Sequence, residues 1–225
     1  MLLRTDNEGG NAWHYAAFWG KLEIMQKIWE LATESLSTEE IKKEILLGKD
    51  KWGKNAWHNA ALGGNLDVLQ KIWELAKERL TTEEIKNEML LRTCNIGWNA
   101  WHFAVSEGKL DVMQKTWELT KNSLTKEEIK KEMFLSKDNR GRNFWLLTAL
   151  VGKLDVLQKI WELAKEILTT EEIKSDMLLR TDNEGRNAWH IAAYGGKLNL
   201  MLKILELTKE RLTSDEIKNE MLLST

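Results

Sequence analysis

Between positions 66 and 80 the chain places apolar residues three or four positions apart and fills the gaps mainly with polar ones. The apolar residues on this spacing are Leu66, Leu69, Ile72, Trp73, Ala76 and Leu80. The spacing puts them on one broad face and predicts an amphipathic helix. No stretch of the sequence alternates apolar and polar residues as a strand would, so the expected fold class is all-α.

Two shorter helices are expected on either side of this long helix. Asn55 is a good N-cap for a helix from Ala56 to about Leu62, and the Gly-Gly pair that follows is positioned to end it. After the long helix, Thr81 and Glu84 have the spacing of a capping box, which predicts a third helix from about Thr82 to Leu91. The next residues are rich in turn formers and predict an exposed loop.

The whole pattern returns every 44 residues, and a tryptophan marks the same place in each copy. The marker tryptophans are Trp13, Trp57, Trp101, Trp145 and Trp189. Self-similarity at this period predicts a solenoid, in which each repeat packs on its neighbours. Because no linker or shift in composition interrupts the pattern, we expect a single domain over residues 1–225. Its five repeats cover about 6–49, 50–93, 94–137, 138–181 and 182–225.

Composition and charge narrow the classes of partner. The chain has 225 residues with a net charge of -2, and the basic and acidic side chains are scattered along it, so we expect no nucleic acid partner. The longest apolar runs are too short to cross a bilayer, so we expect no membrane association. Cys94 is the only cysteine, which excludes an intramolecular disulfide. Together with the lack of an Asn-x-Ser/Thr site, the lone cysteine favours an intracellular, cytoplasmic location.

The segment from Asp6 to Leu31, DNEGGNAWHYAAFWGKLEIMQKIWEL, resembles an ankyrin repeat. Asp6 and Gly9 match the Asp-x-x-Gly segment of that family, called the finger, which precedes the first helix. The Asn-Ala-Trp-His run from Asn11 stands where the family has Thr-Pro-Leu-His, and Gly20 matches the glycine that closes the first helix. The match returns in all five repeats. The resemblance implies an ankyrin-like array that binds proteins along a concave groove.

The period of 44 residues is longer than the period of about 33 that is usual in the ankyrin family. The longer second helix and the additional third helix account for the surplus. A three-helix repeat of this length also suits armadillo and HEAT arrays, but the Asn-Ala-Trp-His signature favours the ankyrin-like interpretation. The expected fold is therefore a solenoid of five stacked ankyrin-like repeats with a third helix in each.

A histidine follows the marker tryptophan in four repeats, as His14, His58, His102 and His190, and Leu146 takes its place in the fourth. Equivalent histidines on stacked helices should lie about 8–10 Å apart, whereas two ligands of one zinc ion lie within about 4 Å of each other. We therefore expect no metal and no cofactor. Each histidine is interpreted as a hydrogen-bonding partner of backbone in its own turn or in the neighbouring repeat.

The remaining unusual side chains have structural interpretations. The marker tryptophans and a second set at Trp29, Trp73, Trp117 and Trp161, which ends at Leu205, are expected in the core. Cys94 replaces the finger aspartate. It is interpreted as a loop residue that has changed without a functional reason, not as a nucleophile. No Ser/His/Asp set, Gly-rich phosphate loop or metal-ligand spacing is present, so the chain is not expected to be an enzyme.

Comparison of the five repeats places the sequence variation at the finger tips and at the end of the first helix. In ankyrin proteins these positions line the groove, and aromatic and arginine side chains dominate binding hot spots. The resemblance therefore implies a set of partner-binding residues: Phe18, Trp19, Trp52, Lys54, Leu62, Ile96, Trp98, Arg140, Arg142, Arg186 and Tyr194.

The function expected first is that of a non-catalytic scaffold that binds a protein partner through these residues. The alternative is a purely structural or designed repeat scaffold, or a fragment of a longer array, with no partner of its own. The ends of the chain bear on this choice. Met1–Leu3 corresponds to Met89–Leu91 at the end of a third helix, and the chain stops at the equivalent Met221–Leu223. Because terminal repeats normally carry a polar outer face, we expect exposed apolar surface at both ends. We therefore expect either that the chain is a piece of a longer protein or that copies of it associate end to end at high concentration.

Overall fold

A computed structural model describes residues 2–222 of the chain and divides it into two compact units, Met1–Leu124 and Thr125–Thr225. Every regular element among the described residues is helical, and no strand occurs there, which confirms the all-α fold class. Met1 and Leu223, which belong to the predicted uncapped ends, lie outside the described residues.

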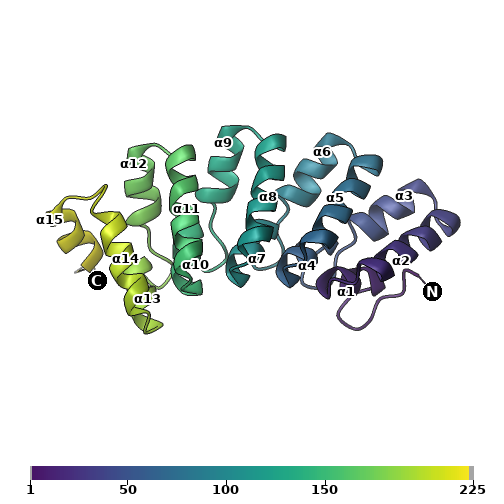
Figure 1. Cartoon of the computed structure of the whole chain (residues 1–225), viewed down its shortest axis with the longest axis horizontal. Coiled ribbons are helices and arrows are strands. Elements are labelled where there is room, and N and C mark those ends of the chain that lie inside the picture. The colour runs from purple at the N-terminus through teal and green to yellow at the C-terminus, as the bar shows by residue number, and fades with distance from the viewer. Residues whose placement is uncertain (1, 223–225) are drawn as a thin grey trace. The chain divides into compact units, whose positions relative to one another are not determined.

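The helices of the first unit, drawn from purple to teal in Figure 1, are α1 (Ala12–Phe18), α2 (Leu22–Ser35), α3 (Thr38–Glu40), η1 (Ile41–Leu46), α4 (Ala56–Gly63), α5 (Leu66–Arg79), α6 (Thr82–Glu84), η2 (Ile85–Leu90), α7 (Ala100–Glu107) and α8 (Leu110–Ser123). The helices of the second unit are α9 (Lys126–Ile129), η3 (Lys130–Phe134), α10 (Phe144–Val151), α11 (Leu154–Ile167), α12 (Thr170–Glu172), η4 (Ile173–Leu178), α13 (Ala188–Tyr194), α14 (Leu198–Thr208), α15 (Ser214–Glu216) and η5 (Ile217–Leu222). The η elements are π-helical.

The caps predicted from the sequence set the ends of these helices. The Asn55 side chain accepts a hydrogen bond from the third backbone N–H of α4, and Gly64 ends that helix in the left-handed conformation, with φ of 72°. A side chain at Gly64 would be strained there because L-residues rarely adopt this backbone conformation. Thr81 and Glu84 form the expected capping box at the start of α6.

The third helical segment of each repeat differs from the α-helix that the sequence predicts. After the three residues of α6 the backbone widens into the π-helix η2, and the N–H of Leu91 donates to the carbonyl five residues earlier, at 2.9 Å. The wider turn of a π-helix brings residues four and five positions apart onto one face. It therefore buries Ile85, Met89 and Leu90 together, which an α-helical turn would splay apart.

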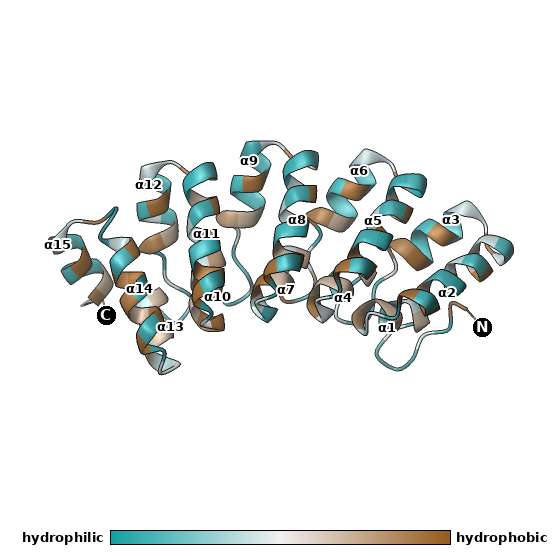
Figure 2. Cartoon of the chain, viewed as in Figure 1, coloured by the Kyte–Doolittle hydropathy of each residue, from teal (hydrophilic) through white to brown (hydrophobic). Residues whose placement is uncertain are grey.

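Within the first unit, equivalent helices pack side by side. Helix α4 contacts both α1 and α7, and α5 contacts both α2 and α8. The apolar stripes of the long helices lie on their inner sides (Figure 2). Each marker tryptophan of the first unit is at most 2% exposed and packs on a tryptophan of the following helix, with ring centroids 5.4–6.0 Å apart. The pairs are Trp13–Trp29, Trp57–Trp73 and Trp101–Trp117.

The second set of tryptophans is less buried than the sequence predicts. Trp117 and Trp161 are buried, but Trp29 and Trp73 are half-buried. Each of these two rings packs one side on its partner tryptophan and leaves another edge to solvent, and the Arg79 guanidinium lies over the ring of Trp29. The prediction that both are core residues is therefore wrong.

The second unit repeats these contacts. Helix α13 packs on α10, α14 packs on α11, and the rings of Trp145 and Trp161 lie 5.7 Å apart. Trp189, which the sequence places in the core, is half-buried. None of the described helices is long and apolar enough to span a membrane.

Candidate functional site

The Asn-Ala-Trp-His run builds a reciprocal cap at the start of the first helix in four of the five repeats. In α4, the Asn55 side chain accepts from the backbone N–H of His58 at 3.1 Å, and the Asn55 backbone N–H donates to Nδ1 of His58 at 3.3 Å. Nε2 of the same ring donates to the carbonyl of Arg92 at 2.8 Å, in the loop that leads to the next repeat. His58 thus links its own cap to a loop 34 residues away, as the sequence-based interpretation expected.

Burial keeps the imidazoles of His14 and His58 neutral. His58 is fully buried, and desolvation lowers the pKa of its ring from 6.5 to about 4. Desolvation also lowers the pKa of His14, which has the same contacts, with Nε2 2.9 Å from the carbonyl of Gly48.

In α10, Leu146 is buried and its backbone N–H still donates to Asn143, so the cap survives without the histidine. Among residues 2–222, no cluster of three or more His, Cys, Asp or Glu side chains is arranged to hold a metal ion.

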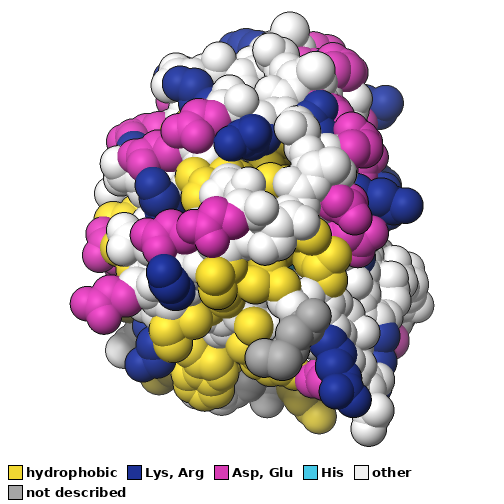
Figure 3. Space-filling view, turned by 90° about the vertical axis from the view of Figure 1, so that its right-hand side faces the viewer, with side chains coloured by type: hydrophobic (Ala, Val, Ile, Leu, Met, Phe, Trp, Pro, Cys, Tyr) yellow, Lys and Arg dark blue, Asp and Glu magenta, His cyan; other side chains and the backbone are white. Residues whose placement is uncertain are grey.

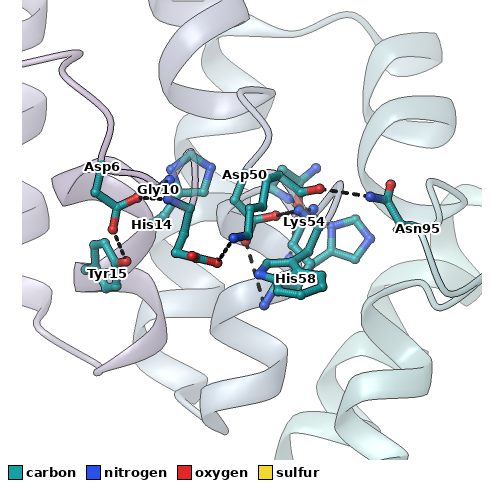
Figure 4. A network of polar contacts seen from close by, with 12 residues as sticks. Asp6, Gly10, His14, Tyr15, Asp50, Lys54, His58 and Asn95 are labelled. Carbon is teal, nitrogen blue, oxygen red and sulfur yellow. Dashed lines mark hydrogen bonds and ion pairs between the residues drawn. The ribbon is translucent and has the colours of Figure 1, made fainter.

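In four of the five repeats the finger turn is held by the aspartate that begins it, and Cys94 begins the third finger. Oδ1 of Asp50 accepts the backbone N–H groups of Trp52 and Lys54, both at 2.9 Å, and Asp6 holds the first finger in the same way. The fingers join each other through the Lys51 N–H, which donates to the carbonyl of Glu8 at 2.8 Å. Figure 4 shows this network running from Asp6 through Asp50 and Lys54. The tip side chains are therefore carried on rigid turns.

The first two fingers and helices α1 and α4 line an open cavity of the first unit, with a volume of about 210 Å³. We call it the finger cavity. Its lining residues are Glu8, Gly10, His14, Tyr15, Phe18, Asp50, Trp52, Lys54 and Asn59. Three of the predicted partner-binding residues, Phe18, Trp52 and Lys54, thus lie around one cavity, which sequence comparison alone did not indicate.

The finger cavity combines aromatic walls with a buried amide. Trp52 lines the cavity and is 53% exposed. Tyr15, on α1, also lines the cavity, and its hydroxyl donates to Asp6 of the first finger at 2.5 Å. This hydrogen bond lowers the pKa of the Asp6 carboxyl, which stays ionised. Asn59 is 95% buried, and its side chain forms no hydrogen bond with any described residue. Its donor and acceptor atoms are the natural site for a group entering from outside, because buried amides are normally paired.

The charged side chains around the finger cavity are already paired. Lys51 forms an ion pair with Glu8 at 2.5 Å, and Nζ of Lys54 lies 3.7 Å from Asp50. The cavity therefore has no uncompensated charge with which to attract an ion, and its open interaction sites are aromatic faces and the Asn59 amide. This chemistry suits the capture of a partner side chain that is apolar in its body and polar at its tip.

The other predicted residues of the first unit lie outside the finger cavity. Trp19 is 65% exposed and its ring meets that of Phe18 edge to face. Leu62 is half-buried and Ile96 is exposed. Trp98 is half-buried because its ring stacks on that of His102, with centroids 6.4 Å apart, and meets that of Phe103 edge to face at 5.3 Å. Trp98, placed by the sequence at an accessible finger tip, is therefore only partly accessible.

The predicted residues of the second unit fall into two groups. Arg140 and Tyr194 are exposed. Arg186 is half-buried and its guanidinium donates to Asp182. Arg142, expected at an exposed tip, is instead buried, and its Nε donates to Asp138 at 2.8 Å. The finger aspartate binds this arginine as well as the backbone of the turn, so the prediction of an accessible Arg142 is wrong.

Sequence comparison missed Tyr15 and Asn59 as site residues. Both stand directly after the histidine of the first helix, where the five repeats carry Tyr, Asn, Phe, Leu and Ile. This position varies as much as the finger tips, and an amide next to a buried histidine was the available signal. Cys94 is also displaced from its predicted environment, because it is buried rather than loop-exposed.

Comparison with known proteins adds no relative from which a function could be transferred. The sequence matches no family model, and no curated protein was found to match it.

Proposed function

We propose that the chain is a non-catalytic protein-binding scaffold, built as a single-domain solenoid of five ankyrin-like repeats with a third helical segment in each. The 44-residue period, the Asn-Ala-Trp-His signature and the recurring order of helices support this architecture. The lone Cys94 supports an intracellular, cytoplasmic setting. The partner is a protein, since the variable side chains are those that dominate protein interfaces.

The observation that carries the proposal is the finger cavity. It lies at the positions where the repeats differ, whereas the caps and the tryptophan pairs behind it recur. Phe18 and Trp52 offer apolar surface, and Asn59 offers a buried amide. A partner that pairs this amide gains a hydrogen bond to a side chain that is largely buried.

The surrounding exposed side chains extend the contact surface of each unit. Trp19 and Ile96 lie on the first unit, and Arg140 and Tyr194 on the second. Hot spots of an interface usually sit in a well-packed centre with weaker contacts around it. We therefore assign the largest share of binding energy to Trp52 and Asn59 and smaller shares to the outer residues.

The test is affinity capture from cell lysate with quantitative mass spectrometry, in which variants of the chain are compared. We expect a defined set of proteins to be retained by the unchanged chain and lost when Trp52→Ala and Asn59→Leu are introduced separately. For a purified partner, Trp52→Ala should weaken binding by about 1–2 kcal/mol.

The matched control is Leu202→Ala, because Leu202 is 54% exposed and stands in the second unit on α14, where the other repeats have glutamine. The control variant should retain the same proteins as the unchanged chain. Capture that is equal for all three variants would show that the finger cavity does not bind the partner.

A further inference from the structure

The outer side of α1 and α2 carries apolar residues whose equivalents are buried in the next repeats. Ile24 is 53% exposed, while Val68 and Val112, one and two periods later, are 1% and 0% exposed. Leu31 is 39% exposed, while Leu75 is 3% exposed. We call this surface the α1–α2 face. It has the composition of a surface that is normally covered.

A groove of about 630 Å³ runs along the α1–α2 face. Leu2, Leu3, Ile28 and Leu31 are among its lining residues. Figure 3 looks at this end of the first unit and shows apolar side chains gathered between rows of charged ones. Such a patch, apolar at the centre and charged at the rim, is typical of a protein interface.

The next repeat shows what covers the same surface there. The π-helix η1 contacts both α4 and α5, and its side chains Ile41, Ile45 and Leu46 are buried. A lysine of the covering segment also forms an ion pair with the capping-box glutamate of the repeat it covers. The pairs are Lys42–Glu84 at 3.4 Å, Lys130–Glu172 at 2.7 Å and Lys174–Glu216.

The first repeat has the glutamate of such a pair, and the last repeat has the lysine. Glu40 lies one period before Glu84, and Lys218 lies one period after Lys174. Glu40 belongs to the capping box of α3, and Lys218 is exposed on η5. Among residues 2–222, neither takes part in an ion pair of this kind. The carboxylate of Glu40 accepts hydrogen bonds from Ser37 in its own cap but has no lysine partner of this kind among the described residues, and η5 carries the matching ammonium group on Lys218.

The end of the second unit also exposes what other repeats bury. Ala193 is exposed, while the equivalent Ala149 is fully buried. Met201 is half-buried, while Leu157 is fully buried, and Leu222 is 41% exposed. We call this surface of α13, α14 and η5 the α14–η5 face. It presents the side of a repeat that normally contacts the following one.

We propose that the α1–α2 face of one molecule binds the α14–η5 face of a second copy of this chain, head to tail. The apolar residues of both faces then become buried, and Lys218 of one copy pairs with Glu40 of the other. Leu2 and Leu222 hold the same place in the 44-residue period, so Leu2 and Leu3 leave the groove when η5 enters it. The interface does not use the finger cavity and is independent of the proposed function.

This association is heterologous, so each added copy again presents both faces to further copies. The test is sedimentation velocity of the purified full chain from micromolar to millimolar concentration. We expect the average mass to rise steadily with concentration. Glu40→Lys and Lys218→Glu should each weaken the association about tenfold, because each places like charges at the contact. Leu31→Asp should weaken it further.

The double variant Glu40→Lys/Lys218→Glu restores opposite charges and should associate like the unchanged chain. That recovery separates a charge effect from misfolding, and circular dichroism of each variant checks its fold. Glu39→Lys and Lys209→Glu carry the same charge changes at neighbouring exposed positions and should have no effect. A chain that stays monomeric at millimolar concentration, a mass that stops at a dimer, or a double variant as weak as the single ones would overturn the proposal.

Discussion

The buried histidine of the second repeat should make the stability of the protein fall in mild acid. The pKa of His58 is about 4 in the folded protein, against 6.5 for an unperturbed histidine, because burial penalises the charged ring. Between these two pH values the unfolded chain binds a proton that the folded protein does not. Stability therefore falls as pH falls from 6.5 to 4, and the loss amounts to about 3 kcal/mol.

The replacement that isolates this effect is His58→Leu, which copies the natural Leu146. At pH 7 the variant should be less stable than the unchanged protein by about 1–2 kcal/mol, because the carbonyl of Arg92 loses its hydrogen bond. The variant has no proton to gain at position 58. The difference in stability should therefore shrink as the pH is lowered below 6.5, reverse between about pH 5 and 6, and favour the variant at pH 4.

The assay is urea-induced unfolding of both proteins at several pH values between 7 and 4, and the quantity of interest is the difference between their free energies of unfolding. Acidic groups titrate in both proteins and cancel in this difference. The reverse replacement, Leu146→His, is the matched control and should add an acid-induced loss. If the two stability curves run parallel from pH 7 to 4, or if the His58 ring titrates near 6.5 by NMR, the reasoning is refuted.

Three further outcomes follow from the structure. Trp52→Ala should change the free energy of unfolding by less than about 0.5 kcal/mol, because the ring is exposed, whereas Trp57→Ala should lower it by about 3–5 kcal/mol; equal losses in chemical denaturation would contradict this. Arg142→Ala should lower stability by about 3 kcal/mol because it leaves the buried Asp138 carboxylate without its guanidinium. The more exposed Arg186→Ala should lower it by about 1 kcal/mol or less, and the same denaturation measurement compares the two. A metal chelator should leave the melting temperature unchanged, and a clear decrease measured by calorimetry would contradict the structural interpretation of the histidines.

Several features of this protein follow from short stretches of sequence. Asn55 caps α4 through an atom three residues away, and Thr81 with Glu84 closes the next cap in the same way. Such contacts depend only on neighbours along the chain, so the residue types and their spacing are sufficient to predict them. The all-α class follows in the same way from the three- and four-residue spacing of apolar positions.

The long-range role of the histidine was predictable only in outline. The spacing of Asn55 and His58 indicates the local half of the contact. The acceptor, the carbonyl of Arg92, lies 34 residues away, and the sequence gives no signal that distinguishes it from other loop carbonyls. The π-helical turn of η2 likewise depends on packing, since it forms where three apolar side chains must face one neighbour.

Tertiary structure determined which residues are accessible at the candidate site and which are buried. Trp52 and Arg142 both stand at finger tips in the sequence, yet the first is half open to solvent and the second is buried on Asp138. Asn59 becomes a site residue only because α1, α4 and two fingers meet around it. Periodicity determines which residues share a helix face, because that depends on backbone geometry alone. Exposure and cavities depend on which other segments cover that face, and those segments lie a full repeat away along the chain.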